Sequence, residues 1–339
     1  MNNVFVYCEI EDGKVAEVSL EILSKGRSLA NDLKCELEAI VLGNKIKDVE
    51  DELFGFGVDV IHIANDKRLY PYLTLPHAAI VSGIFEAEKP KVGLFGATSI
   101  GRDLAPRVSS KLMCGLTADC TELEIGDYTD KKSKKEYKDL LMQIRPAFGG
   151  NIIATIITPD TLPQLATVRE GVMKKEVVKK VKKGKVVKIK VDDYVSETDM
   201  VVKIIERHIE KSEVDLKNSN IIISGGYGVG SKEDFNLLYE LSDVLGGEVG
   251  ASRAAVDAGF VDHNRQVGQT GLTVRPKLYI ACGISGQIQH TAGMDKSAMI
   301  ISINTDPHAP INKIADYVIN GKVGTVIPKM IKSYKEHTK

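Results

Sequence analysis

Short apolar runs alternate with helix-like segments along the whole chain, and this alternation constrains the fold more than any other feature of the sequence. In the first half, runs of strand length occupy residues 4–8, 37–42, 58–64, 91–95 and 152–157. Between the first two runs, leucines recur at helical spacing from Leu20 to Leu33. Such alternation is typical of a mostly parallel sheet with helices on its faces. The sequence therefore predicts an α/β fold.

The length of 339 residues and a polar segment after residue 209 predict two domains. This segment, residues 210–220, reads EKSEVDLKNSN and has no apolar periodicity, as is common where domains join. We therefore expect an N-terminal α/β domain at residues 1–209. A C-terminal domain, Rossmann-like and mostly parallel, is expected at residues 210–339, because apolar runs there end directly in turns that contain glycine, asparagine or aspartate. These runs are residues 221–224, 277–282 and 299–303.

Residues 174–190 contain nine lysines interleaved with valines, which predicts a hairpin that turns at Gly184. Its charged face is either a surface for an anionic partner or a solvated sheet edge protected by lysine. Because 45 basic residues against 46 acidic ones leave a net charge of −1, we favour the protected edge. The same balance argues against nucleic acid as the main ligand.

Other compositional features exclude several classes of protein. No apolar run approaches the roughly 18 residues of a membrane span, and the N-terminus lacks the basic and apolar regions of a secretory signal. The five cysteines form no CxxC pair, so we expect a reducing, cytoplasmic setting. None of the seven histidines has a second ligand at a usual metal spacing, so no metal site is expected.

The first turn that could carry chemistry contains Gly225, Gly226, Gly228 and Gly230, followed by Ser231 at the start of a helix. Glycines there let the main chain approach an anion, and a helix N-terminus offers free N–H donors. The spacing matches neither GxGxxG nor the Walker A motif. A plain tight turn therefore remains the alternative to a phosphate-binding loop.

A second turn begins with Arg253, and the glycine-rich stretch QVGQTG that follows it brings in Gln266, Gln269 and Thr270. An arginine beside amide and hydroxyl groups suits a planar heteroaromatic ligand that carries several carbonyls. The alternative is an ordinary surface ion pair between Arg253 and Asp257, four positions later.

The third and fourth turns follow the apolar runs at residues 277–282 and 299–303. The third approaches the GxSxG nucleophile elbow around Ser285, but Gln287 replaces the final glycine, so a serine hydrolase is poorly supported. The fourth presents Asn304 and Asp306 at the end of a strand, where open α/β sheets bind ligands. The four turns together predict an extended ligand with an anionic part and a planar polar part, such as FAD or NAD.

Several of these segments resemble the alpha subunit of electron-transfer flavoprotein. The resemblance rests on GASRAAVDAGF (250–260), QVGQTG (266–271), LYIACGISGQIQHTAG (278–293), GRDLAPRVSSKLMCGLTADCTEL (101–123) and RPAFGGNI (145–152). It implies a heterodimer in which the N-terminal domain packs on a beta subunit and the C-terminal domain holds FAD non-covalently.

The resemblance also implies roles for individual residues. Arg253, preceded by Ser252, would lie against the flavin ring. Thr270 would lie near flavin N5, and a protonated His290 would face the C2 carbonyl. Arg253 and His290 would then stabilise the negative charge of reduced flavin, so these three residues would tune the cofactor, and no nucleophile or general base is expected. Asn304 would contact the adenosine part. The other expected FAD contacts are Gln266, Val267, Gly268, Gln269, Gly283, Ile284, Ser285, Gly286, Gln287, Ile288 and Gln289, of which Ser285 and residues 283–289 match the pyrophosphate-binding turn.

Three positions depart from the family pattern. Tyr227 and Leu272 stand where many members carry arginine and lysine, and Lys322 stands where an acidic residue is frequent. Tyr227 and Leu272 hint at the electron-bifurcating branch. Members of that branch carry a second FAD in the beta subunit, accept electrons from NADH and divide them between ferredoxin or flavodoxin and an acyl-CoA substrate. The segments around Arg102 and Phe148 are interpreted as interface packing rather than as contacts with the cofactor of the partner.

The expected partners are thus the beta subunit, an acyl-CoA dehydrogenase-type flavoenzyme and, in a bifurcating complex, ferredoxin or flavodoxin. Two alternatives remain open at this point. One is a simple carrier with a single FAD, and the other is a nucleotide-binding assembly subunit without redox function.

Overall fold

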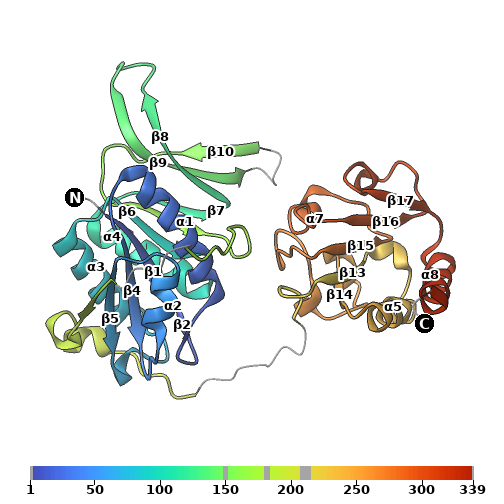
Figure 1. Ribbon diagram of the computed structural model, residues 1–339, viewed down its shortest axis with the longest axis horizontal. Helices are drawn as coiled ribbons and strands as arrows, with labels where there is room; N and C mark the ends of the chain where they lie inside the picture. Colours follow the sequence, from blue (N-terminus) through green and yellow to red (C-terminus); the bar gives the residue numbers. More distant parts are fainter. Residues whose placement is uncertain (1–2, 148–151, 179–183, 207–214, 338–339) are drawn as a thin grey trace. The chain divides into compact units, whose positions relative to one another are not determined.

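The computed structural model describes residues 3–147, 152–178, 184–206 and 215–337 (Figure 1). These residues form two compact units, one within residues 3–206 and the other within residues 215–337, and each unit is described by itself. The predicted boundary between residues 209 and 210 lies outside the described residues. In the described ranges, no helix combines the length and the apolar character that crossing a membrane requires.

The first unit is built on a seven-stranded sheet in the order β12-β5-β4-β1-β6-β11-β7, and every neighbouring pair is parallel. This arrangement confirms the predicted α/β fold, and the apolar runs near residues 4, 37, 58 and 91 all become strands of this sheet. The strands are β1 (Val4–Cys8), β4 (Leu37–Gly43), β5 (Val60–Asn65), β6 (Val92–Gly96), β7 (Leu116–Cys120), β11 (Gln164–Val168) and β12 (Lys185–Lys188).

Helices cover both faces of this sheet, because successive side chains of a strand point to opposite sides. Val4, Val6 and Cys8 of β1 pack in one apolar cluster with residues of α1 and α2, whereas Phe5 and Tyr7 pack in another with residues of α3 and α4. The helices are α1 (Glu17–Leu33), α2 (Val49–Gly55), α3 (Thr74–Glu88) and α4 (Ser99–Leu112). Short elements in this unit are β2 (Ile10–Glu11), β3 (Lys14–Val15), η1 (Lys67–Leu69), η3 (Val191–Asp193) and η4 (Glu197–Met200).

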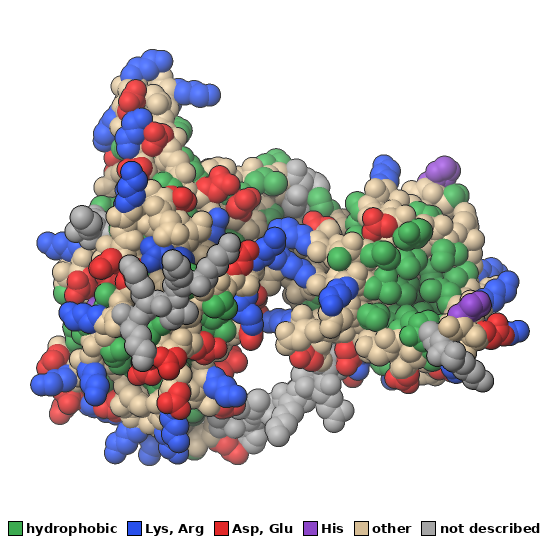
Figure 2. Space-filling model, viewed as in Figure 1, with side chains coloured by type: hydrophobic (Ala, Val, Ile, Leu, Met, Phe, Trp, Pro, Cys, Tyr) green, Lys and Arg blue, Asp and Glu red, His purple; other side chains and the backbone are tan. Residues whose placement is uncertain are grey.

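A separate three-stranded sheet contains the fifth predicted strand of the first half. β10 (Ile152–Ile156) joins the order β10-β9-β8 with β9 (Glu136–Ala147) and β8 (Glu122–Thr129), and β8 and β9 are antiparallel. The apolar run was therefore read correctly as a strand, but it is not part of the parallel sheet. Lysine and acidic side chains mix on the β8–β9 hairpin (Figure 2), where Lys138 pairs with Asp127 at 2.9 Å.

The predicted hairpin at Gly184 is wrong. β12 pairs in parallel with β5, residues 174–178 form no strand, and residues 179–183 lie outside the described residues. The glycine is needed for a close approach rather than for a turn, since a Cβ at Gly184 would lie 2.2 Å from the carbonyl oxygen of Asp59. Because β12 is an edge strand and exposes Lys185 and Lys188, the interpretation as a protected sheet edge is supported.

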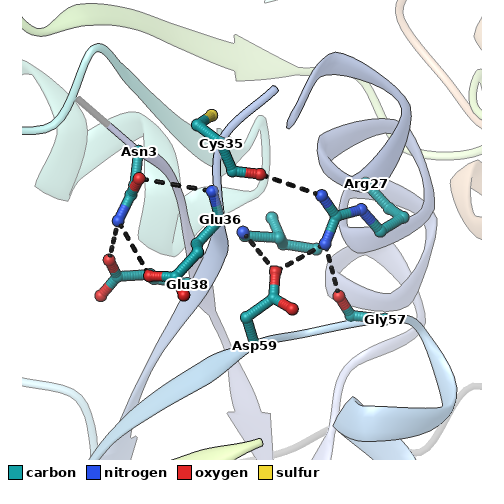
Figure 3. Close-up of polar contacts among 8 residues, drawn as sticks. Asn3, Arg27, Cys35, Glu36, Glu38, Gly57 and Asp59 are labelled. Carbon is teal, nitrogen blue, oxygen red and sulfur yellow. Dashed lines mark hydrogen bonds and ion pairs between the residues drawn. The ribbon is translucent and has the colours of Figure 1, made fainter. Parts of the chain in front are cut away.

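At the amino ends of β4 and β5, Arg27 of α1 forms hydrogen bonds with neighbouring segments (Figure 3). Its guanidinium donates to Asp59 at 2.6 Å and to the carbonyl oxygens of Gly57 and Cys35 at 3.0 and 3.2 Å. A shallow cavity of about 820 Å³ lies here. Because the charge of Arg27 is already paired with Asp59, this polar cluster serves to hold the end of the sheet together.

Glu9 directly follows β1 and is almost completely buried, with 2% of its surface exposed. Its Oε1 accepts a hydrogen bond of 2.7 Å from the hydroxyl of Thr98. Burial raises the pKa of the Glu9 carboxyl to about 7, and the bond from Thr98 opposes this shift only in part.

We expect Glu9→Gln to flatten the pH dependence of stability. Because the folded pKa of about 7 exceeds the ordinary value of 4.5, the folded state holds the proton more tightly between these values. The wild-type contribution is therefore complete below pH 4.5 and is lost as the pH rises through 7, by about 1.4 kcal/mol per pH unit. Urea unfolding at pH 5, 6, 7 and 8 checks this, and parallel curves for variant and wild type would contradict it.

The second unit contains a five-stranded, fully parallel sheet in the order β14-β13-β15-β16-β17. This confirms the Rossmann-like, mostly parallel fold expected for the C-terminal part. The strands are β13 (Ile221–Gly225), β14 (Glu248–Ala251), β15 (Leu278–Cys282), β16 (Ile300–Asn304) and β17 (Tyr317–Asn320). The helices are α5 (Asn236–Leu245), α6 (Arg253–Asp257), α7 (Ile288–Thr291), α8 (Val323–His337), η5 (Tyr227–Val229), η6 (His263–Arg265) and η7 (Pro310–Lys313).

Candidate functional site

A cavity of about 460 Å³ lies at the carboxyl ends of β13, β14, β15 and β16, a size typical of small-molecule sites. Since β14 and β15 flank β13 on opposite sides, the strand order reverses there, and ligands of open α/β sheets bind at such a point. The cavity is lined by Gly226, Tyr227, Gly228, Ser252, Arg253, Ala254, Gln266, Val267, Gly268, Thr270, Gly283, Ile284, Ser285, Gln287, Gln289, His290, Asn304, Asp306, Ala309 and Pro310.

Two glycine turns meet at this point of reversal. The N–H of Gly226 donates to the carbonyl oxygen of Cys282 at 2.8 Å, and the N–H of Gly228 donates to that of Gly283 at 3.1 Å. A Cβ at Gly226 would lie 2.2 Å from the carbonyl oxygen of Gly283. We call this contact of Gly226, Gly228 and Gly283 the glycine seam. It brings main chain directly against main chain, which larger residues would prevent.

Arg253 begins α6 and lines the cavity. Its Nε also donates to Asp257 at 3.3 Å, so the alternative ion pair is present as well. The Arg253 side chain is 68% exposed, and exposed pairs of this kind contribute only about 0.3–0.5 kcal/mol. The guanidinium can therefore turn to an anionic ligand at little cost. The N–H of Ser252 donates to the carbonyl oxygen of Gly225 at 2.9 Å and ties this turn to β13.

The QVGQTG segment is held by its own side chains and by the turn after β15. The Gln266 amide donates to the hydroxyl of Thr270 at 2.9 Å. The N–H of Gln269 donates to the carbonyl oxygen of Gln289 at 2.7 Å. Gly268 has a φ of +142°, and a Cβ there would lie 2.5 Å from that same oxygen of Gln289. The loop thus presents the Thr270 hydroxyl at the cavity wall in a fixed position.

His290 is buried between two protein partners. Its Nδ1 lies 3.0 Å from the carbonyl oxygen of Val267, and its Nε2 lies 3.0 Å from the hydroxyl of Tyr279. Since a carbonyl only accepts, Nδ1 carries the proton, and the Tyr279 hydroxyl donates to Nε2. Burial raises the pKa of Tyr279, which keeps that hydroxyl protonated.

The described structure does not by itself favour a charged His290, so the charge expected beside reduced flavin stays a prediction. Burial lowers the pKa of this histidine to about 4, and the hydrogen bond to Val267 opposes the shift only in part. His290 is therefore neutral at pH 7. It connects the Val267 loop to β15 and in this way positions the cavity wall.

Asn304 and Ser285 line the end of the cavity beside β16. The Asn304 amide donates to the carbonyl oxygen of Ile284 at 2.8 Å, and its Oδ1 accepts from the N–H of Asp306 at 3.0 Å. The N–H of Ile311 donates to the carbonyl oxygen of Ser285 at 3.1 Å. These bonds connect the turn after β15 with the turn after β16.

Two families match this chain in succession. The family described as "Electron transfer flavoprotein domain" matches residues 4–194, and the family described as "Electron transfer flavoprotein FAD-binding domain" matches residues 215–295. The chain is 47% identical over 335 residues to "Electron transfer flavoprotein subunit alpha" of Thermoanaerobacterium thermosaccharolyticum, with 98% of each chain covered. The chain belongs to the electron transfer flavoprotein alpha-subunit family.

Other relatives of this alpha-subunit family carry related names. The electron transfer flavoprotein subunit alpha of Clostridium acetobutylicum is 44% identical, with 98% of this chain and 96% of that protein covered. The protein named "Acryloyl-CoA reductase electron transfer subunit beta" of Anaerotignum propionicum is 40% identical, with the same shares covered. The family resemblance read from the sequence is thus confirmed.

Most residues that the alpha-subunit resemblance assigned to FAD line one cavity. Gln269, Gly286 and Ile288 do not line it, although the first two fix the turns behind its wall. Phe148 lies outside the described residues. Arg102 lies in α4 with a guanidinium nitrogen 3.7 Å from Asp119. Cavity residues absent from the predicted set are Gly226, Tyr227, Gly228, Ala254, Asp306, Ala309 and Pro310.

The cavity residues absent from the predicted FAD contacts differ in how clearly the sequence marks them. The sequence marked the glycine turn at Gly226 and Gly228 and the strand end at Asp306. It did not show that these segments line the same cavity. Ala309 and Pro310 follow β16 without any chemical pattern that marks them.

In the described part of this alpha-family chain, no group of three or more histidine, cysteine, aspartate or glutamate residues could hold a metal ion.

We expect the neutral His290 to make the second unit sensitive to acid. Because the folded pKa of about 4 lies below the ordinary 6.5, the unfolded state binds the proton more tightly. Stability is complete above pH 6.5 and falls by about 1.4 kcal/mol per pH unit as the pH drops towards 4. His290→Gln, which keeps a donor and an acceptor, should remove this slope. Unfolding curves at pH 4.5 to 7 measure it, and an unchanged slope in the variant would argue against a buried neutral histidine.

Proposed function

We propose that this chain binds FAD in the cavity of its second unit and carries electrons as the alpha subunit of a heterodimeric electron transfer flavoprotein. The observation that supports this most directly is the meeting of four turns at the point where the strand order reverses. The turns after β14, β15 and β16 contribute residues that the family resemblance assigns to the cofactor, and the turn after β13 adds Gly226, Tyr227 and Gly228. Family membership supports the electron-transfer role, and the matched FAD-binding family supports the choice of cofactor.

The chemistry of the cavity wall fits the parts of FAD. A planar ring with carbonyls suits the Thr270 hydroxyl and the cationic Arg253, together with apolar surface from Val267 and Ile284. The pyrophosphate suits the Ser285 hydroxyl and the main chain of its turn. Asp306 offers the kind of acceptor that binds ribose hydroxyls in dinucleotide sites. The residues present therefore match an extended dinucleotide with a planar end and an anionic middle.

When bound, FAD supplies the electron chemistry, and the residues of this chain bind and orient it and set the local charge. Arg253 provides a permanent positive charge that favours a negatively charged ligand over a neutral one. The Gln266 amide directs its N–H to Thr270, so the threonine hydroxyl keeps its own proton free to donate towards the cavity. The neutral His290 holds the loop that carries both groups.

The partners in this proposal are a beta subunit and an acyl-CoA dehydrogenase-type flavoenzyme. Support for the second comes from the relative whose name places it with acryloyl-CoA reductase. A bifurcating complex that uses NADH and ferredoxin or flavodoxin is the form that we favour. Its support is local: an aromatic Tyr227 lines the cavity, and Leu272 packs against the apolar cluster around Val267 and Tyr279, so neither position supplies a cation.

Co-expression with the beta subunit tests these proposals. We expect a yellow heterodimer with two FAD molecules that NADH reduces. One FAD and no response to NADH would identify a simple carrier and remove the bifurcation proposal. A complex that stays colourless after FAD is added would overturn FAD binding itself and favour an assembly subunit without redox function.

A further inference from the structure

Three aromatic rings contact one another in series from the core of the second unit to the wall of the cavity. Phe235 is fully buried, and its ring centroid lies 5.8 Å from that of Phe260 at an interplanar angle of 57°. Phe260 in turn lies 5.8 Å from Tyr227, and these two rings are nearly parallel at 17°. Tyr227 ends this series of rings and is 65% exposed. One face of the tyrosine ring is thus held by protein, and much of the rest remains accessible.

The main chain on both sides of Tyr227 is fixed as well. Gly226 and Gly228 flank it, and both donate their N–H groups across the glycine seam. The N–H of Gly230 donates to the carbonyl oxygen of Tyr227 at 3.2 Å. An aromatic side chain with two rotatable bonds on such a support loses little entropy when a ligand packs against it. The ring is therefore pre-organised for contact at the cavity wall, where Tyr227 lies.

Several contacts place Tyr227 beside the turn of Arg253. Ser252 donates to Gly225, two residues before the tyrosine, and the N–H of Phe260 donates to the carbonyl oxygen of Ala255 in α6 at 3.0 Å. Phe260, on which Tyr227 stacks, is thus held at the carboxyl end of the helix that starts with Arg253. Because Tyr227 and Arg253 line the same cavity, one planar ligand can contact both.

We propose that Tyr227 is a positioning residue that packs its free ring face against the isoalloxazine ring of FAD. This inference rests on the proposed FAD site. Offset stacking of aromatic rings contributes modestly but with defined geometry, so its main effect is on the orientation of the flavin in the cavity. The phenol hydroxyl is not required for stacking, which separates this role from hydrogen bonding.

The test uses the full chain purified with its beta subunit, stripped of FAD and titrated with FAD, FMN or ADP. FMN carries only the isoalloxazine half of FAD, and ADP carries only the adenine half. Tyr227→Leu should weaken FAD and FMN binding about 2- to 10-fold, leave ADP binding unchanged and increase the fluorescence of bound flavin. Tyr227→Phe should behave as wild type. Tyr317→Leu is the matched control, because Tyr317 is 59% exposed on β17 and does not line the cavity.

Three outcomes would overturn the inference while leaving the FAD site intact. The first is unchanged FMN affinity and fluorescence in Tyr227→Leu. The second is a loss of affinity confined to ADP, which would place the tyrosine on the adenine side. The third is an equal loss of flavin affinity in Tyr227→Phe. Wild-type protein that binds no FAD would overturn the proposed function as well. Thermal unfolding without ligand checks folding. If Tyr227→Leu is unstable, Tyr227→Met with the same three titrations replaces it.

Discussion

Gly286→Ala is expected to destabilise the second unit by about 2–5 kcal/mol and to abolish FAD binding at micromolar FAD. Gly286 has a φ of +85°, a region that costs a residue with a Cβ roughly 1–2 kcal/mol. A Cβ at this position would also lie 2.2 Å from the main-chain nitrogen of Ile311. Because the obstacle is main chain, the turn after β15 has to move, and it takes the cavity residue Ser285 with it. Urea unfolding and FAD titration measure the two effects.

Gly246→Ala is the matched control for this prediction. Gly246 ends α5 with a φ of +69°, but no atom lies within 4 Å of the position of its added Cβ. Only the backbone cost of about 1–2 kcal/mol should appear, with unchanged affinity for FAD. If the two variants lost equal stability and equal affinity, the close approach of Gly286 to Ile311 would have no role in forming the cavity.

Arg253→Ala is expected to lower the reduction potential of the FAD in the second unit by roughly 65 mV for a one-electron step. A hydrogen bond to a charged group contributes about 1.5–3 kcal/mol, and 1.5 kcal/mol corresponds to about 65 mV. We take the lower end because the side chain is largely exposed and water screens its charge. In the proposed site, the arginine would stabilise the negatively charged reduced form more than the neutral oxidised form, so its loss would favour oxidised flavin. A spectroscopic redox titration measures this shift.

Asp257→Asn provides the control for the arginine. It removes the ion-pair partner, 3.3 Å from the Arg253 guanidinium, and keeps the cation at the cavity wall. The potential should stay the same or rise slightly, because the arginine then has no competing carboxylate. Equal potentials in wild type and Arg253→Ala would refute the proposed tuning role.

The strands were predictable from the sequence because each apolar run has the length of a β-strand. The run near residue 4 becomes β1 with the expected bounds, and those near residues 221, 277 and 299 become neighbours in one sheet. The pairing partners were less accessible. β10 and β12 pair through main-chain groups that carry no side-chain signal, so the sequence could not show that β10 leaves the parallel sheet or that β12 joins its far edge.

The candidate site shows the same limit. Arg253, Thr270 and Asn304 were singled out by the chemistry of their turns, and the family resemblance gave them roles. Strand pairing then brings these turns together. The turn at Gly226 was noticed but left out of the predicted set, because its spacing matched no phosphate-binding motif. Its place in the wall follows from the pairing of β13 with β15, which no local motif encodes. The lowered pKa of His290 follows from its burial, which also requires the folded structure.

The cavity wall contains positions formed by main chain, at the glycine seam, and positions formed by side chains, and only the latter can be redesigned. Gly226, Gly228 and Gly283 touch through main chain, so their contribution to the wall does not depend on side-chain chemistry. Tyr227 and Asp306 line the same cavity with side chains. Substitutions at these two positions should change ligand preference without reshaping the base on which the ligand rests. An engineer who seeks a different nucleotide or a different potential should therefore keep the three glycines and diversify those two positions.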